Sequence, residues 1–159
     1  MLEGNEPWFT AHEKLDVEPE TYDRFSAKTY APDRILEEAV TFIDDHAKEP
    51  FFLYFASTIP HLALQIPDEE LDVYPESWDT KPYLGDKGYL PHPRPRAAYA
   101  AMITRFDAEV GAIVKALKDN NVADNTIIVV TSDNGPSWVG GVDMDFFGSK
   151  GGLHGRKAQ

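Results

Sequence analysis

The strongest constraint on the fold is the regular alternation of two helix-forming stretches with two short apolar runs. The stretch APDRILEEAVTFIDDHAKEP, residues 31–50, predicts a helix that ends at Pro50, and the apolar run FFLYFAS at 51–57 follows directly. A second helical stretch at 96–120 is followed by a β-branched run at 126–131. Helices that alternate with buried strands are typical of a parallel sheet with helical crossovers. We therefore expect an α/β fold, with a partial, mostly parallel sheet flanked by helices.

Both predicted helices carry apolar side chains at helical spacing. In the first helix these are Ile35, Leu36, Ala39, Val40, Phe42 and Ile43. In the second they are Tyr99, Met102, Ile103, Phe106, Val110, Ile113, Val114 and Leu117. Residues 60–96 hold many of the 12 prolines and predict a long surface excursion within one domain. Residues 1–30 are polar with scattered aromatic side chains and predict an extended or loop segment.

Composition excludes several classes of function. The net charge of −12 disfavours binding to nucleic acid, because a phosphate backbone selects for lysine and arginine. The absence of cysteine excludes disulfides, cysteine-ligated zinc and thiol nucleophiles. No apolar run approaches the roughly 18 residues that a membrane span needs. The N-terminal segment MLEGNEPWFTAHEKLD is polar and acidic and does not have the pattern of a signal peptide, and nothing in the chain indicates a localisation.

Polar side chains follow both predicted strands at the points where they end. Residues 57–61, with sequence STIPH, follow the first strand, and residues 133–135, with sequence DNG, follow the second. Ligands of parallel α/β sheets bind beyond the carboxyl ends of the strands. We therefore expect the two clusters to open onto one rim, with the side chains of Asp133, Asn134 and His61 converging there.

Each cluster has a functional and a purely structural interpretation. Asp133 and Asn134 offer oxygen ligands of the kind that Ca²⁺ and Mg²⁺ prefer, but Asp-Asn-Gly is also a common turn sequence. His61 could bind an anion or transfer a proton, or it could simply be a surface residue. The C-terminal stretch combines glycines with basic residues such as Lys150 and Lys157, which suits an oxyanion, but it could equally be a flexible tail. Its order does not match a nucleotide-binding phosphate loop.

Three segments together closely resemble a known family. They are PFFLYFASTIPHLALQIPDE at 50–69, AAYAAMITRFDAEVGAIVKALKDNNVADNTIIVVTSDNG at 97–135, and GGLHGRKAQ at 151–159. In order and spacing they resemble the middle of type I sulfatases, the arylsulfatase-like members of the alkaline phosphatase superfamily, from about Thr29 onward. The resemblance implies that residues 1–159 are the central part of a sulfatase catalytic domain, without its N-terminal part and its C-terminal subdomain.

The resemblance also implies roles for four residues. Asp133 and Asn134 correspond to calcium ligands, so one Ca²⁺ ion is the expected cofactor. His61 and Lys157 correspond to the catalytic residues that bind the sulfate ester. The segment departs from the family pattern at His154, where arginine is common, and at Arg156, which replaces a glycine.

Several family features are not found in the chain. Type I sulfatases use a formylglycine nucleophile made from the first residue of a C/S-x-P-x-R motif. The nearest match is Tyr30-Ala31-Pro32-Asp33-Arg34, and tyrosine is not a precursor of that aldehyde. The remaining calcium ligands would also lie upstream. We therefore expect a fragment that is inactive alone and binds calcium weakly, since Ca²⁺ takes about six to eight oxygen ligands.

The functional expectation is a sulfuric ester hydrolase that acts on a sulfate ester, with sulfated carbohydrate one candidate substrate. The loop at 62–96, with Trp78, Tyr83, Tyr89, Arg94 and Arg96, could line the approach to the site or could be a packed loop. Unpaired sheet edges could let the fragment self-associate. The alternatives are a phosphodiesterase-like member of the same superfamily, a non-catalytic binding or assembly module, and a decayed gene product. Full-length relatives are often periplasmic, secreted or lysosomal.

Overall fold

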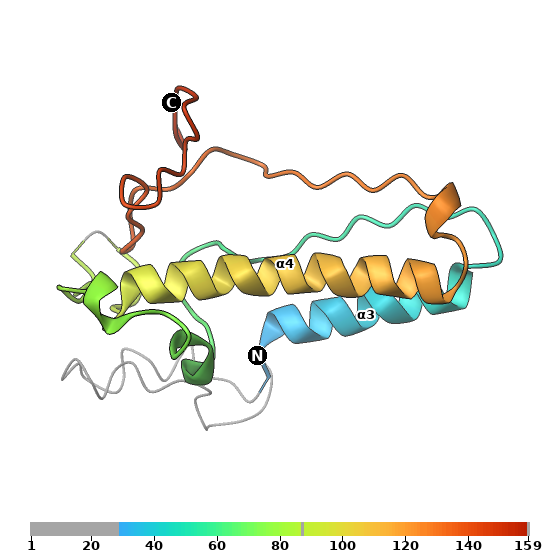
Figure 1. Cartoon of the computed structure of the whole chain (residues 1–159), viewed down its shortest axis with the longest axis horizontal. Coiled ribbons are helices and arrows are strands. Elements are labelled where there is room, and N and C mark those ends of the chain that lie inside the picture. Colours follow the sequence, from blue (N-terminus) through green and yellow to red (C-terminus); the bar gives the residue numbers. More distant parts are fainter. Residues whose placement is uncertain (1–28, 87, 159) are drawn as a thin grey trace.

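The computed structural model describes residues 29–86 and 88–158, and these contain two long α-helices and three short 3₁₀ helices (Figure 1). Helix α3 spans Ala31–His46 and α4 spans Pro95–Asp119. The 3₁₀ helices are η1 (Asp68–Leu71), η2 (Glu76–Trp78) and η3 (Ala123–Asn125). Both α-helices therefore lie where their apolar periodicity predicts them. The expectation for residues 1–28 lies outside the described part of the chain.

Both helices begin with a proline in the first turn, where its fixed φ suits the helix and no hydrogen bond is lost. The first helix is shorter than predicted, because it ends at His46 rather than at Pro50. The backbone N–H of Glu49 donates to the carbonyl of His46 in a closing turn, 3.1 Å away. A proline disfavours the helical conformation in the residue before it, so the chain leaves the helix ahead of Pro50.

The helices α3 and α4 pack side by side and run in the same direction (Figure 1). Their C-terminal halves meet through the buried side chains of Ile43, Ala116 and Leu117. Phe51 and Leu53, in the segment that follows α3, pack against the same cluster. The first apolar run is thereby held against the pair of helices.

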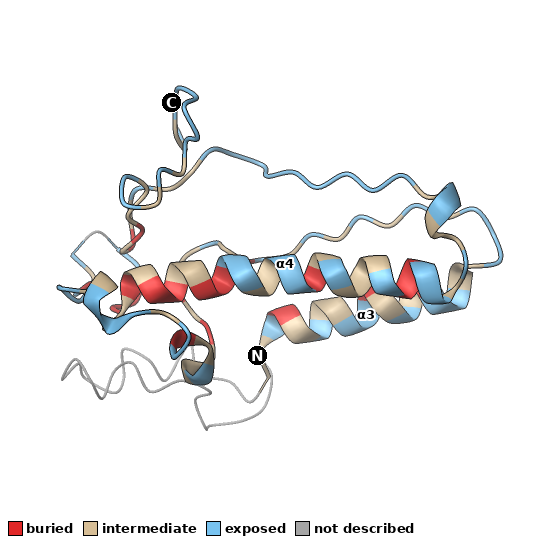
Figure 2. Ribbon diagram, viewed as in Figure 1, coloured by how far each residue is buried: buried red, intermediate tan, exposed pale blue. Residues whose placement is uncertain are grey.

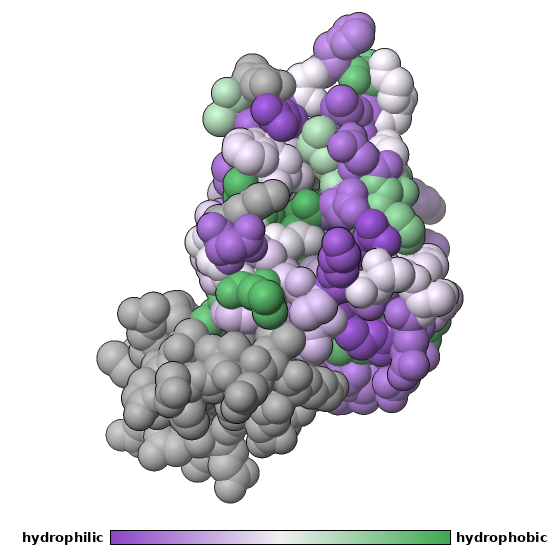
Figure 3. Space-filling model, turned by 90° about the vertical axis from the view of Figure 1, so that its left-hand side faces the viewer, coloured by the Kyte–Doolittle hydropathy of each residue, from purple (hydrophilic) through white to green (hydrophobic). Residues whose placement is uncertain are grey.

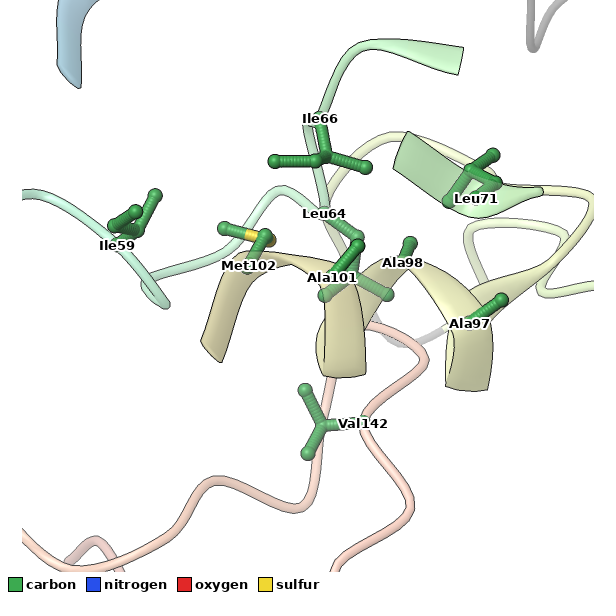
Figure 4. Close-up of a cluster of buried hydrophobic side chains, with 9 residues drawn as sticks. All are labelled: Ile59, Leu64, Ile66, Leu71, Ala97, Ala98, Ala101, Met102 and Val142. Atoms are coloured by element: carbon green, nitrogen blue, oxygen red, sulfur yellow. The ribbon is translucent and has the colours of Figure 1, made fainter. Parts of the chain in front are cut away.

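A second and larger core covers the first half of α4, where buried residues face the loops (Figures 2 and 4). Its buried members are Ile59, Leu64, Ile66, Leu71, Ala97, Ala98, Ala101, Met102 and Val142. The three alanines let loop backbone approach the helix closely, and the larger aliphatic side chains of the loops fill the space above them. This core fixes the long segment between the helices onto α4, so the segment is packed rather than free.

The two apolar runs are extended, and the described residues contain no β-strand. Both runs return from the end of α4 toward its beginning, antiparallel to the helices, as strands of an α/β unit would (Figure 1). Burial alternates along residues 51–58, as in a strand with one covered face, whereas Ile127 is 92% exposed and Val129 is 78% exposed. Backbone hydrogen bonds to neighbouring strands are needed to make a sheet, so the sheet itself stays a prediction.

The loop between the extended segment and α4 carries η1, η2 and one isolated antiparallel bridge between Tyr83 and His92. No helix among the described residues has both the length and the apolar character to cross a membrane.

A cluster around Arg105 joins three parts of the described chain. Its guanidinium, on α4, forms ion pairs with Asp33 at the start of α3 and with Glu70 in η1. It also lies 5.3 Å from the ring centroid of Tyr30, whose hydroxyl donates to the carbonyl of Gln65 at 3.0 Å. Arg105 therefore fixes the positions of α3 and η1 on α4 through its ion pairs, in addition to the apolar contacts of the core.

We expect Arg105→Ala to lower the free energy of unfolding by about 1–2 kcal/mol, because it leaves two partly buried carboxylates without their cation. Arg34→Ala is the matched control, since the partners of Arg34 among the described residues are the exposed Glu37 and Glu38 of the same helix, and it should cost less than about 0.5 kcal/mol. Urea denaturation followed by circular dichroism measures both. Equal losses in the two variants would contradict this role for Arg105.

Candidate functional site

His61 lies in the turn that follows the first extended segment. Its ring is exposed, its Nδ1 lies 2.6 Å from the carbonyl oxygen of Leu62, and its ring centroid is 6.2 Å from that of Tyr89. The neighbouring Ile59 is buried in the larger core, which anchors the backbone of this turn. The histidine is thus presented to solvent from a fixed support, as a group that binds a ligand would be.

Asp133 and Asn134 lie in the exposed turn that ends the second extended segment. The hydroxyl of Ser132 donates to the carbonyl of Asn134, and the amide nitrogen of Asn134 donates to the carbonyl of Gly135, each at 2.9 Å. The segment is therefore a turn with its own hydrogen bonds, and the Asp133 carboxylate is exposed on it. Within the described ranges no group of three or more histidine, aspartate or glutamate side chains could hold a metal ion.

The C-terminal segment folds back onto this turn. The backbone N–H of Lys157 donates to the carbonyl of Pro136 at 3.1 Å. A Cβ added at Gly135 would lie only 3.3 Å from the backbone of Arg156, so the absence of a side chain at Gly135 allows this close approach. The structure thus brings together the segment of Lys157 and the turn of Asp133 and Asn134, which are more than twenty positions apart in sequence.

The turn that carries His61 is connected to the same region through its neighbour Leu62. A Cβ added at Gly140 would lie 2.6 Å from the Leu62 side chain, so Gly140 permits the chain beyond the Asp133 turn to pack against the His61 turn. No hydrogen bond or ion pair between described residues joins the His61 side chain to Asp133, Asn134 or Lys157. The convergence of the four side chains on one ligand therefore stays a prediction.

The segment Tyr30–Arg34, which has the spacing of a nucleophile motif, has a structural role instead. Tyr30 is half-buried beside Arg105, and burial raises the pKa of its hydroxyl well above the usual range. Pro32 lies in the first turn of α3, Asp33 pairs with Arg105, and Arg34 pairs with exposed glutamates of the same helix. These contacts give each of these residues a structural role, and none of them requires that Tyr30 act as a nucleophile.

Sequence reasoning missed Glu109, a buried carboxyl group next to the site. Glu109 is 2% exposed, its Oε2 accepts a 2.8 Å hydrogen bond from the hydroxyl of Ser57, and its buried Oε1 has no hydrogen-bond partner among the residues that the structure describes. Burial raises the pKa of Glu109, and the hydrogen bond from Ser57 opposes that shift. The sequence did indicate that Glu109 is buried, because it follows Phe106 by three positions and so falls on the apolar face of the helix.

The bond between Ser57 and Glu109 matters for the site because of its position. Ser57 is the last residue of the first apolar run, four residues before His61. Its hydroxyl is fixed to the middle of α4, so the end of the extended segment cannot shift along the helix without breaking a buried hydrogen bond. Glu109 is therefore a positioning residue for the His61 turn.

The comparisons with known proteins agree on one family. The family model described as Sulfatase matches residues 3–159. The uncharacterized sulfatase YdeN of Escherichia coli (strain K12) is 35% identical over 116 residues, which cover 71% of this chain and 18% of that protein. The N-acetylgalactosamine-6-sulfatase of Homo sapiens is 32% identical over 105 residues, which cover 65% of this chain and 16% of that protein.

Among solved structures, that of Ps i-CgsB in complex with k-i-k-neocarrahexaose is similar to this chain, with a TM-score of 0.55 and 38% sequence identity. The match covers 69% of this chain and 22% of that chain. This chain therefore spans less than a quarter of the length of each of these relatives.

We expect Glu109 to make the stability of the fold depend on pH. The pKa of Glu109 is raised in the folded state, so its contribution to the free energy of unfolding is fully present below the pKa of the unfolded chain, near 4.5. That contribution is lost as the pH rises through the pKa of the folded state. Glu109→Gln removes this loss, so its free energy of unfolding relative to wild type should increase as the pH is raised from about 4 to 7. Denaturant titrations at several pH values measure this difference.

Glu76→Gln is the control for that experiment, because Glu76 lies exposed in η2. Its difference from wild type should stay nearly constant over the same range. A constant difference for Glu109→Gln as well would mean that the carboxyl group is not destabilised by burial.

Proposed function

Because the chain belongs to the sulfatase family, we propose that it forms the central part of a catalytic domain that hydrolyses sulfuric esters. The observation that best supports this is the contact between the Lys157 segment and the turn of Asp133 and Asn134, made at Gly135 and Pro136. A cation and a pair of oxygen ligands are thereby carried on two adjoining loops. Adjacent loops of this composition suit a site that binds an oxyanion beside a metal ion.

In the proposed site, Lys157 and His61 act on the sulfate ester. Cleavage of the ester increases negative charge on the leaving oxygen, and the Lys157 ammonium group would stabilise that charge. His61 would act as a general acid that donates a proton to the leaving oxygen. The formylglycine that supplies the nucleophile in this family would come from polypeptide outside the chain described.

The donor atoms of Asp133 and Asn134 fit a calcium ion in kind but not in number. Carboxylate and amide oxygens are hard ligands of the type that Ca²⁺ binds, but the ion takes about six to eight of them. Asp133 and Asn134 would thus hold the ion together with ligands from elsewhere in a full-length protein. When bound, the ion would supply positive charge beside the ester.

The two extended segments support a proposal about the fold of the whole domain. They run in one direction, each follows a helix, and they leave apolar side chains such as Phe52, Ile127 and Val129 exposed. The relatives are more than four times as long as the matched part, so they have ample chain to cover this surface. We infer that both segments become strands of a mostly parallel sheet, and that the chain by itself can associate through them.

The relatives also suggest a class of substrate. N-acetylgalactosamine-6-sulfatase is named for a sulfated sugar, and Ps i-CgsB was solved with k-i-k-neocarrahexaose. We therefore infer that the substrate is a sulfated carbohydrate.

We expect the 159-residue chain to release no sulfate from 4-nitrophenyl sulfate, and a chimera to be active. In the chimera, the matching segment of human N-acetylgalactosamine-6-sulfatase is replaced by this chain, and sulfate release from N-acetylgalactosamine 6-sulfate is measured. In the chimera, His61→Ala and Lys157→Ala should each lower kcat by about 10²–10³-fold, the usual cost of removing one group that stabilises developing charge.

The matched controls are His46→Ala and Lys115→Ala, which remove the same side-chain types from helix positions outside the proposed site. They should leave kcat within about twofold of the unmodified chimera. A folded chimera in which His61→Ala and Lys157→Ala behave like their controls would contradict the proposal. Turnover by the isolated chain that disappears in Asp133→Ala would show that the chain needs no further polypeptide.

Calcium binding by the isolated chain should be weak, with a Kd in the millimolar range, because two side chains provide few of the ligands. Calorimetric titration with CaCl₂ measures it, and Asp133→Asn should weaken it further. Asp145→Asn, an exposed aspartate in another loop, is the control and should change nothing. A micromolar site would show that other ligands are present in the chain.

A further inference from the structure

A groove of about 490 Å³ lies next to the proposed site, between the loop after η2 and the loop at 138–145. Its lining includes Trp78, Lys81, Arg96, Trp138, Asp143 and Arg156. Figure 3 looks onto the end of the molecule at which α4 begins and shows hydrophilic and hydrophobic side chains interspersed there. We propose that this groove is a saccharide subsite, which holds the sugar unit next to the one that carries the sulfate ester. This inference rests on the proposed function.

The groove adjoins the site through consecutive residues. Arg156 lines the groove and is followed directly by Lys157, whose backbone N–H is bonded to Pro136. Trp138, two residues beyond Pro136, lies on the same wall. The groove therefore begins one residue away from Lys157 along the chain.

Trp138 is the surface on which a sugar ring can stack. It is 45% exposed even though the guanidinium of Arg156 lies over its ring, 4.6 Å from the centroid. An indole offers a flat apolar face, which matches the C–H face of a pyranose, and its orientation is restricted by the arginine. Arg156, the residue that replaces the glycine of the family pattern, is thus assigned a function in positioning Trp138.

The part of the lining around Trp78 is held by contacts within the protein. The ring of Trp78 packs edge-on against Phe146 and Phe147, with centroids 5.4 and 6.0 Å away. Arg96 lies 4.2 Å from the Phe146 centroid and donates a 2.7 Å hydrogen bond to the carbonyl of Trp78. A wall fixed in this way loses little conformational entropy when a ligand binds.

The charges favour hydroxyl groups over a second anion. The guanidinium of Arg96 pairs with Asp143 at 2.7 Å, and a hydrogen bond from the backbone of Phe146, together with Arg96, lowers the pKa of that carboxyl. Asp79 accepts hydrogen bonds from the backbone of Arg96 and Ala97 at the start of α4. The groove is lined by three cationic side chains (Lys81, Arg96 and Arg156) and four carboxylates (Asp79, Asp86, Asp143 and Asp145), so it has no excess of positive charge. It offers polar contacts around an aromatic surface, as carbohydrate hydroxyls require.

Binding of two probes to the 159-residue chain tests the subsite. The probes are a sulfated galactose hexasaccharide and its chemically desulfated counterpart, with Kd measured by calorimetry or NMR titration. The desulfated probe should bind the wild type, Trp138→Ala should weaken that binding by about fivefold or more, and Trp138→Phe should keep most of it, because a smaller aromatic ring still stacks. Tyr54→Ala is the control, since Tyr54 is 80% exposed on an extended segment and does not line the groove.

The same titration separates this inference from the proposed function. The sulfated probe should bind more tightly than the desulfated one, and Lys157→Ala should remove that gain without changing the affinity for the desulfated probe. Equal affinities for the two probes, with the dependence on Trp138 intact, would overturn the sulfate site and leave the subsite standing. The subsite is overturned if the wild type binds neither probe, if Trp138→Ala behaves like Tyr54→Ala, or if Trp138→Phe loses as much affinity as Trp138→Ala.

Discussion

Every other described part of this chain depends on the burial of one face of α4. Alanines in the first half of the helix allow loop backbone to approach closely, and Ala116 and Leu117 near its end receive Ile43 of α3. Between these two apolar contacts lie Arg105 and Glu109, which make the polar contacts to α3, η1 and the first extended segment. A single helix thus fixes both the position and the register of the elements that carry the site.

The site itself depends on close approaches at glycine rather than on secondary structure. Gly135 lets the backbone of Arg156 lie against the Asp133 turn, and Gly140 lets Leu62 lie against the chain beyond it. A Cβ at Gly135 would press on the backbone of Arg156, and one at Gly140 would overlap the present position of the Leu62 side chain. The groove with Trp138 is a consequence of the same folding back, because Arg156 then lies over the indole ring.

The helices could be predicted from the sequence to within a few residues because their signal is local. Apolar spacing and the prolines at 32 and 95 define where α3 and α4 lie. The extended runs were also predictable as segments, but a sheet requires backbone partners that the described residues do not supply. The loop aromatics and arginines had two interpretations, a packed loop and a lining of the approach, and several of them fit both. Tyr83 is buried and Arg96 donates to the carbonyl of Trp78, yet both residues also line the groove together with Trp78.

The sequence by itself determined the order of the elements, the chemical types at the ends of the extended runs, and the membership of the sulfatase family. The first two are encoded in spacing along the chain, and the third follows from the resemblance of its segments to the family. Only the tertiary structure decided that Lys157 lies beside the Asp133 turn, that Ser57 is bonded to a buried Glu109, and that Trp138 and Trp78 face one groove. These contacts join residues far apart in sequence, and they arise from close packing, which no periodic pattern in the chain specifies.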